Sequence, residues 1–410
     1  MKKVTTLLLA AVLLAGMLPG RAAAVDLNLN AKSALLMDVA TGTVLYEKEC
    51  HERLAPASVT KVMTMLLIME ALDDGRIHLD DQVTASEAAA AKGGSQIYLK
   101  AGETMPVSDM LKSIAVSSAN DCACAMAELI AGSESAFVEQ MNQRAAELGM
   151  ADTHFVNCTG LDDSKEAESH RTSAYDIALM SRQLLKYHPD IKKYTTIWMD
   201  TVRGGTFGLS NTNKLIRFYS GATGLKTGFT SGAGDRLSAT AKREGKEPSP
   251  ARYCISATAE REGMELIAVV MGCESAQKRT ADCKALLDYG FATYSVVRPG
   301  LKAGRTVAVH LGKQNTVPVE LTERREILVD KAKRTSLTAK VELAQLVPAP
   351  VEKGQQVGTI SVYAGEKLLI QLPLAAAQAV AKLSFGDVFK LVLERVCMIA
   401  PAEADASASA

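Results

Sequence analysis

A serine and a lysine stand three residues apart at Ser58 and Lys61, where a mostly apolar run begins. Pro56 favours an extended residue before it and can open a helix, so a helix is expected to begin near Ala57 or Ser58. Residues three apart share a helix face, which brings the lysine amine within reach of the serine hydroxyl. A lysine held among apolar neighbours and near a second cation can lose its proton and act as a base. The pair is therefore a candidate nucleophile with its base.

The Ser-x-x-Lys pattern is short and is expected about once by chance in a chain of this composition. A second copy stands at Ser275–Lys278, after an apolar run that resembles a strand. Arg279, Asp282 and Lys284 follow it, and this charged setting predicts a solvated turn that leads into a helix. We therefore interpret the second copy as a decoy.

Two other short strings could contribute to the same chemistry. Ser118–Asn120 interrupts a helical pattern, and Lys226–Gly228 follows Gly221 and Gly224 in a short strand-like run. Serine and asparagine at a helix junction are most often simple caps. Lysine, threonine and glycine on a strand can offer a cation, a hydroxyl and close backbone approach, but this string alone favours an ordinary hairpin strand.

The joint occurrence of the three strings in this order favours a catalytic interpretation. They resemble the motifs of serine D,D-peptidases and penicillin-binding proteins, and most closely those of the low-molecular-weight D-alanyl-D-alanine carboxypeptidases. Four further segments resemble the family's opening hairpin, its loop beside the active site, the segment before its central loop and the approach to its third motif. These segments are residues 33–46, 93–95, 153–162 and 211–213.

The resemblance implies a mechanism. Ser58 attacks the carbonyl of the penultimate D-alanine of a peptidoglycan stem peptide, and Lys61 accepts its proton. Ser118 bridges Lys61 and Lys226 and passes a proton to the departing D-alanine. Water then hydrolyses the acyl-enzyme. A β-lactam mimics the substrate and acylates Ser58.

The resemblance also implies substrate-binding roles along the second and third motifs. Asn120 binds the amide backbone of the substrate, Lys226 supplies charge and Thr227 helps to hold the terminal carboxylate. Backbone N–H groups of Ser58 and Phe229 form the oxyanion hole. The predicted substrate-binding residues are Asn120, Lys226, Thr227, Gly228 and Phe229.

The chain of 410 residues is long enough for two domains. Strand-like runs near residues 33–46 and 225–272 enclose a helical stretch, which predicts an α/β arrangement. The family's fold, to which this corresponds, is an antiparallel five-stranded sheet beside an all-helical lobe, with the active site at the junction. We expect this catalytic domain over 25–295 and a small all-β domain over 296–382.

Residues 1–24 have the features of a signal peptide, with two lysines, an apolar stretch and a small-residue cleavage site. The mature chain is therefore expected outside the cytoplasm, in the cell wall or at the outer face of the cytoplasmic membrane. The formal net charge of zero gives no indication of a nucleic-acid partner. The eight cysteines form no framework of paired spacings and are expected to be free and mostly buried. No metal and no cofactor are expected, because the six histidines show no ligand spacing.

One region departs from the family pattern. Residues 235–245 recur, slightly altered, as residues 253–263, which indicates a tandem duplication of one strand. Sheet register allows one copy beside the partner strand, and the second copy has the short return turn. We expect the second copy to pair, while the first either stays in the strand order near Lys226 or loops out. The duplication could reduce activity.

The C-terminal residues 383–400 predict an amphipathic helix, followed by a flexible tail over 401–410. Its apolar residues recur at steps of three and four, from Phe385 to Val396. Such a helix could dock on its own β domain. The resemblance favours a helix that lies in the membrane surface.

Two alternative functions remain open. A serine β-lactamase shares the three motifs, but it normally lacks the β domain and carries a dedicated glutamate before the third motif. Glu166 and Glu168 lie in that region without the Glu-x-x-x-Asn pattern. A wall-binding or regulatory protein with an impaired site is the second alternative.

Overall fold

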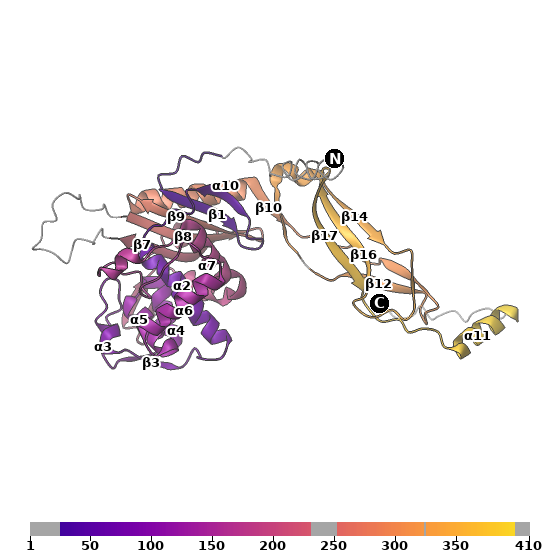
Figure 1. The fold of residues 1–410 in the computed structure, drawn as a ribbon, viewed down its shortest axis with the longest axis horizontal. Coiled ribbons are helices and arrows are strands. Elements are labelled where there is room, and N and C mark those ends of the chain that lie inside the picture. Colours follow the sequence, from indigo (N-terminus) through magenta and orange to yellow (C-terminus); the bar gives the residue numbers. More distant parts are fainter. Residues whose placement is uncertain (1–24, 231–251, 324, 398–410) are drawn as a thin grey trace, which may run out of the picture. The chain divides into compact units, whose positions relative to one another are not determined.

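The computed structural model describes residues 25–230, 252–323 and 325–397, and these divide into two units after Phe291 (Figure 1). The predicted domain boundary near residue 295 falls inside strand β10 (Tyr294–Val297). The predicted signal peptide and C-terminal tail lie outside the described residues.

The first unit contains the predicted five-stranded sheet, and every neighbouring pair in it is antiparallel. The strand order is β2-β1-β9-β8-β7, so the two strands from the start of the first unit complete a sheet with three strands from its later part. This prediction is confirmed. The strands are β1 (Ser33–Asp38), β2 (Val44–Lys48), β7 (Ala222–Thr230), β8 (Arg252–Arg261) and β9 (Met264–Cys273).

The two faces of this sheet meet different helices, because successive side chains on a strand alternate in direction. Leu35 of β1 belongs to the main core with helix α2 (Lys61–Asp73) and helix α7 (Ala174–Tyr187). Leu36 points the other way, toward helix α10 (Ala276–Thr293), where a Cβ on Gly290 would lie 2.9 Å from it. The helical lobe and α10 therefore cover opposite faces of the sheet (Figure 1).

The helical lobe surrounds α2, whose residues are buried almost throughout. A helix that is apolar on all sides is expected at the centre of a core, and α2 fits this description. The other helices of the first unit are α3 (Glu87–Ala90), α4 (Val107–Ser117), α5 (Asn120–Ala131), α6 (Glu134–Glu147), α8 (Lys192–Thr195), α9 (Leu215–Phe218) and the short η1 (Ala57–Thr60), η2 (Glu166–Ser169) and η3 (Pro189–Ile191). Two small hairpins add β3 (Gln82–Thr84) with β4 (Thr104–Pro106) and β5 (Met199–Val202) with β6 (Phe207–Ser210).

The second copy of the duplicated segment forms strand β8. It pairs with β9 through the short turn at Glu262 and Gly263, as predicted, and its other edge pairs with β7. Both edges of β8 are thus occupied, which leaves no place for the first copy between β7 and β9. All of the first copy, residues 235–245, lies outside the described residues, so whether it stays near the Lys226 strand or loops out stays a prediction.

The second unit is the predicted all-β domain. Its six-stranded sheet has the order β14-β16-β17-β12-β11-β15, and β10 pairs with β13 in a separate ladder. Valines on β11, β12 and β16 meet in one small core. The elements are β11 (Thr306–His310), β12 (Thr316–Leu321), β13 (Ile327–Asp330), η5 (Lys331–Ser336), β14 (Leu337–Leu343), β15 (Leu346–Pro348), β16 (Gln356–Ala364), β17 (Lys367–Ala376) and α11 (Phe385–Val396).

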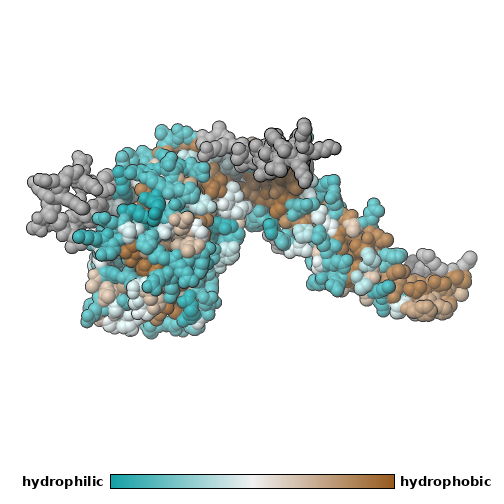
Figure 2. All heavy atoms as spheres, in the orientation of Figure 1, coloured by the Kyte–Doolittle hydropathy of each residue, from teal (hydrophilic) through white to brown (hydrophobic). Residues whose placement is uncertain are grey.

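Helix α11 corresponds to the predicted C-terminal helix and is shorter than the predicted 383–400. Its large apolar side chains are exposed, including Phe385 at 87% and Phe389 at 59%. Figure 2 shows hydrophobic residues gathered over this helix. The apolar face is therefore not buried on the β domain. Among the described residues, no helix combines the length and the apolar character that a membrane crossing requires.

Candidate active site

The first motif forms a tight turn and the start of α2. Ser58 lies in η1, and Lys61 is the first residue of α2. The Lys61 ammonium donates hydrogen bonds to Ser58 Oγ at 3.0 Å and to the Thr159 carbonyl at 2.7 Å. Burial lowers the pKa of Lys61 to about 7, although Cys158 and Asp121 oppose this shift. At neutral pH a large fraction of this amine can therefore accept a proton.

The second motif lies between α4 and α5. Ser118 ends α4 in the left-handed conformation with φ of 64°, which turns the chain sharply before α5 begins at Asn120. The Asn120 side-chain amide donates to the Gly93 carbonyl at 2.7 Å, and its backbone N–H donates to Ser95. Its Oδ1 is buried and has no hydrogen-bond partner among the described residues. This oxygen is free to accept a hydrogen bond from a ligand.

The third motif lies on β7. Lys226 is buried, and its ammonium donates to the Thr227 carbonyl at 3.2 Å. Burial, and then the positive charges of Lys61 and Arg279, hold the pKa of Lys226 well below its ordinary value. The Thr227 hydroxyl donates to Thr212 Oγ1 at 2.7 Å.

The fold brings the three motifs to one place. A Cβ on Gly228 would lie 2.7 Å from the Pro56 carbonyl and 2.5 Å from Cys254 Sγ, so β7 approaches the nucleophile turn without room for a side chain. The Thr212 N–H donates to the Val116 carbonyl, which links the segment before β7 to the end of α4. Phe229, the next residue of β7, is half exposed at the edge of this site.

One predicted contact is not formed. In the part of the chain that the structure describes, no hydrogen bond joins Ser118 to Lys61 or Lys226. The two lysines instead bond to Ser58, Thr159 and Thr227. The proton-passing role of Ser118 therefore stays a prediction, as do the roles of the other site residues.

Arg279 is a residue that the sequence interpretation missed. The charged run after the decoy serine predicted solvent exposure, which is correct for Lys278 and wrong for Arg279. Its guanidinium lies 3.5 Å from the carbonyls of Gly228 and Cys254, and its Nε is buried without a partner among the described residues. The burial of the Arg279 side chain depends on how α10 packs against the sheet, and this packing cannot be predicted from the local composition.

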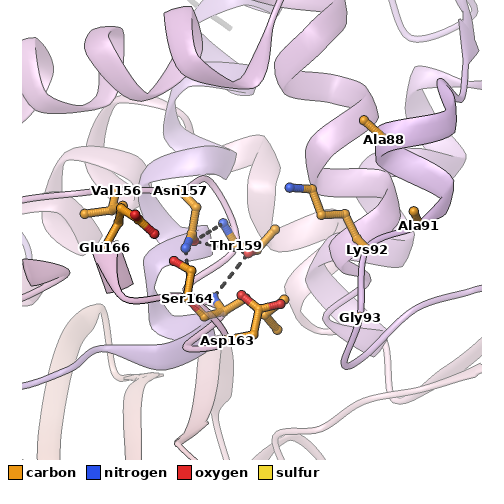
Figure 3. Close-up of a pocket in the computed structure, with 11 residues that line it drawn as sticks. Ala88, Ala91, Lys92, Gly93, Val156, Asn157, Thr159, Asp163, Ser164 and Glu166 are labelled. Carbon is orange, nitrogen blue, oxygen red and sulfur yellow. Dashed lines mark hydrogen bonds between the residues drawn. The ribbon is translucent and has the colours of Figure 1, made fainter. Parts of the chain in front are cut away.

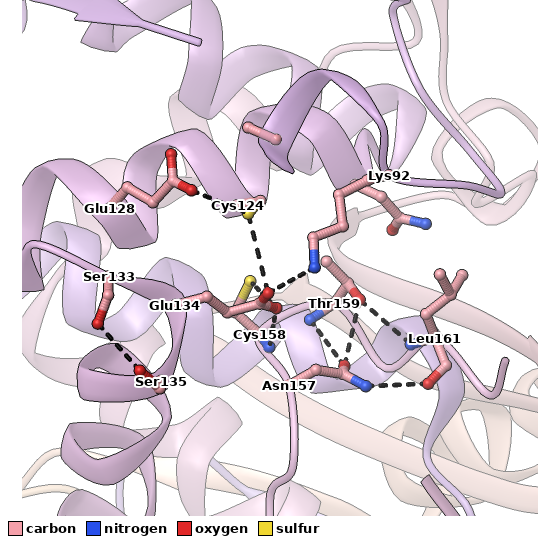
Figure 4. Close-up of polar contacts among 12 residues, drawn as sticks. Lys92, Cys124, Glu128, Ser133, Glu134, Ser135, Asn157, Cys158, Thr159 and Leu161 are labelled. Carbon is pink, nitrogen blue, oxygen red and sulfur yellow. Dashed lines mark hydrogen bonds and ion pairs between the residues drawn. The ribbon is translucent and has the colours of Figure 1, made fainter. Parts of the chain in front are cut away.

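A short loop supplies the carbonyl that holds Lys61, and we call residues 156–161 the lysine-holding loop. The Asn157 carboxamide stabilises this loop: its oxygen accepts hydrogen bonds from the N–H groups of Thr159 and Gly160, and its nitrogen donates one to the Leu161 carbonyl (Figure 4). The loop forms one wall of a cavity of about 470 Å³, and Lys92 and Gly93 lie on the opposite wall (Figure 3).

The cysteines of the described residues are free, as predicted. Seven are buried and Cys397 is exposed. Cys124 and Cys158 both contact the Glu134 carboxylate, which also pairs with Lys92 (Figure 4). Cys122 and Cys124 form no disulfide with each other, as their positions on one helix predicted.

Comparisons with known proteins agree with this geometry. The D-alanyl-D-alanine carboxypeptidase family matches residues 20–251, and the C-terminal domain of penicillin-binding protein 5 matches residues 291–382. The D-alanyl-D-alanine carboxypeptidase DacF of Bacillus subtilis is 42% identical over 367 residues, which cover 88% of each chain.

Solved structures extend the likeness to three dimensions. Penicillin-binding protein 6B from Escherichia coli aligns with a TM-score of 0.67 at 30% identity and covers 87% of this chain and 98% of its own. Penicillin-binding protein D2 from Listeria monocytogenes, solved in an ampicillin-bound form, aligns with a TM-score of 0.53 at 29% identity over 65% of this chain and 100% of its own. The chain belongs to the D-alanyl-D-alanine carboxypeptidase family of serine peptidases.

Proposed function

We propose that this chain removes the terminal D-alanine from peptidoglycan stem peptides through an ester on Ser58. The observation that carries the proposal is the buried Lys61 amine, 3.0 Å from Ser58 Oγ and with a pKa of about 7. A hydroxyl is a weak nucleophile at neutral pH, and an adjacent neutral amine can take its proton as the bond to carbon forms.

The reaction proceeds by acylation and then hydrolysis. Ser58 Oγ bonds to the carbonyl carbon of the penultimate D-alanine, and its proton passes to Lys61. Collapse of the intermediate breaks the carbon–nitrogen bond, and the departing amine takes a proton from Lys61 through the Ser118 hydroxyl. Water then cleaves the ester and regenerates Ser58. Backbone N–H groups of Ser58 and Phe229 bind the oxyanion, and each donor contributes roughly 3 kcal/mol.

Arg279 indicates the class of ligand. Its side chain is buried and forms no salt bridge among the described residues, and a guanidinium keeps its positive charge. A buried charge without a counter-ion is costly, so this site favours a ligand that brings a negative charge. A peptide with a free terminal carboxylate meets this requirement, with Thr227 and Arg279 as its partners and Asn120 on its amide backbone.

Replacement of Arg279 by Gln tests this assignment. We expect kcat/KM for a pentapeptide that ends in D-Ala-D-Ala to fall about 10- to 100-fold, the effect of losing a hydrogen bond to a charged group. The same peptide with a C-terminal carboxamide is the control, because it offers no charge and its slower turnover should be equal in both proteins. An equal loss on the acid and the amide would contradict carboxylate binding by Arg279.

Purified protein, a pentapeptide and a fluorescent penicillin test the activity itself. Release of one D-alanine per peptide together with a long-lived covalent label is the expected result. A label that is hydrolysed rapidly would indicate a β-lactamase, and the absence of label and of release would indicate an impaired wall-binding protein. The ampicillin-bound relative supports the expectation that β-lactams acylate Ser58.

The exposed apolar side chains of α11 support a place for the enzyme at the outer face of the cytoplasmic membrane. Phe385, Phe389 and Val396 expose 59–87% of their surface, which is unusual for large apolar groups in water. An amphipathic helix of this kind can lie in the membrane interface with its apolar face buried.

A chain that ends at Lys382 tests this placement. We expect it to stay in the supernatant when membrane vesicles are pelleted, while the full chain sediments with them and both retain penicillin labelling. Burial of apolar side chains, rather than ionic attraction to lipid headgroups, should hold the helix at the membrane, so binding should survive roughly 0.5 M salt. This concentration is about five times the one at which the Debye length is 10 Å, and it screens ionic attraction strongly. Equal sedimentation of both chains would contradict the anchor.

A further inference from the structure

His170 is a buried histidine that joins the two chain segments on either side of Lys61. One ring nitrogen, Nε2, lies 2.8 Å from Thr60 Oγ1, and the other, Nδ1, accepts a hydrogen bond from the Val156 N–H at 3.1 Å. Thr60 immediately precedes Lys61, and Val156 begins the lysine-holding loop. The imidazole therefore connects the nucleophile turn to the loop whose Thr159 carbonyl binds the Lys61 ammonium.

The hydrogen bonds determine the tautomer of this ring. Nδ1 accepts, so in the neutral imidazole Nε2 carries the hydrogen and donates it to Thr60. Burial, followed by the charges of Arg171, His154 and Lys61, lowers the pKa of His170 to about 3. The ring is consequently neutral throughout the physiological range and cannot act as an acid or a base for the reaction.

The nucleophile turn and the lysine-holding loop also meet in direct contact. A Cβ on Gly160 would lie 1.8 Å from the Ala57 carbonyl and 2.7 Å from Thr60 Oγ1, so the two segments pack as closely as backbone permits. Gly160 has φ of 77°, a conformation that glycine adopts readily. So close a contact requires the distance between the nucleophile turn and the lysine-holding loop to stay constant. The His170 ring, which is hydrogen-bonded to both segments beside Gly160, can keep that distance.

Other anchors hold the loop to different parts of the lobe. The Thr64 hydroxyl donates to the Cys158 carbonyl at 2.6 Å, and the Cys158 N–H and thiol both contact Glu134. These contacts fix the middle of the loop to α2 and α6. The His170 bridge differs from them because it reaches Thr60, the residue immediately before Lys61.

We infer that His170 is a positioning residue, which acts through Thr60 and the lysine-holding loop to keep the Lys61 amine between Ser58 Oγ and the Thr159 carbonyl. This inference rests on the proposed role of Ser58 and Lys61. The bridge should matter for the acylation step rather than for initial binding, because Asn120, Lys226 and Arg279 lie on other segments.

A double-mutant cycle with His170→Asn and Thr60→Val isolates the bridge. The asparagine carboxamide is shorter than the imidazole ring: its oxygen can still accept from Val156 but its nitrogen cannot reach Thr60, and valine removes the same contact from the other side. We expect each single variant to acylate with a fluorescent penicillin about 10-fold more slowly, with the affinity of the initial complex unchanged. The double variant should be no slower than either single one, because both substitutions remove one interaction.

Thr172→Val is the matched control. Thr172 is buried like Thr60, and its hydroxyl pairs with Thr153 Oγ1 at 2.7 Å, away from Lys61. This variant loses a comparable buried hydrogen bond and should acylate within about twofold of the unmodified protein. His170→Gln, whose longer amide can reach Thr60, should recover part of the rate that His170→Asn loses.

The pH profile separates positioning from a general loss of folded protein. A loosened loop admits water to Lys61 and raises the pKa of this amine, so the acid limb of the acylation profile should move to higher pH in both single variants. The ionisable groups that interact with Lys61 are Lys226, Asp121, Cys158 and His170. Unfolding of part of the sample would lower the labelled fraction without moving the limb.

Three results would overturn the inference: unchanged acylation in both single variants, additive losses in the double variant, or equal losses in Thr172→Val. Failure of the proposed function would look different, because the unmodified protein would then take up no stable label. The labelled fraction at saturation, measured with each rate, distinguishes the two cases.

Discussion

Ser58→Ala is expected to abolish both penicillin labelling and release of D-alanine. The covalent route needs the Ser58 oxygen, and the methyl group of alanine cannot replace it. The variant should still bind the peptide, because Asn120, Lys226 and Arg279 remain in place. Mass spectrometry of the digested β-lactam adduct provides the direct measurement, since the added mass must lie on the peptide that contains Ser58.

Ser275→Ala is the internal control for this experiment, because Ser275 begins the second Ser-x-x-Lys copy. Its hydroxyl accepts a hydrogen bond from the Lys278 N–H at the start of α10, so the change removes a helix cap worth about 1 kcal/mol. Labelling and turnover should change by no more than a small factor. An adduct on a serine other than Ser58 would refute the interpretation of the first motif and the roles assigned to Ser118 and Lys226.

The first motif was predictable because it depends on local geometry: Ser58 and Lys61 stand three apart at the start of a helix, which places the amine near the hydroxyl. The second and third motifs were predictable only from their joint occurrence with the first in this order. The five-stranded sheet could be expected from the early and late strand-like runs together with the family resemblance. The pairing of β8 also followed from its short return turn, which fixes the register of a hairpin.

The supporting residues could not be predicted because they depend on tertiary packing. Arg279 lies in a charged run, and its burial follows from the contact of α10 with the sheet. His170 follows Glu166 and Glu168 in a polar stretch, yet its ring is buried at 3% exposure because residues 154–156 fold back over it. Neither residue has a local pattern that would distinguish it from a solvated neighbour.

The pH dependence of acylation should show an acid limb with its midpoint near pH 7. Lys61 must be neutral to accept the Ser58 proton, and its pKa is lowered from 10.5 to about 7 by burial. Below that pH the amine is protonated, so the rate should fall tenfold for each further pH unit, and above it the rate should level off. Stopped-flow measurement with a chromogenic β-lactam from pH 5 to 9 provides the profile.

Lys61→Arg separates the base from the charge at this position. A guanidinium stays protonated at every accessible pH, so it keeps the positive charge and cannot accept the serine proton. We expect acylation to fall by about 10² to 10⁴, the usual contribution of a general base, while the initial complex with the anionic β-lactam forms with little loss of affinity. The acid limb near pH 7 should disappear with the titrating amine. A variant that acylates slowly but retains the same limb would assign the titration to another group, and Lys226 would then be the first candidate for the base.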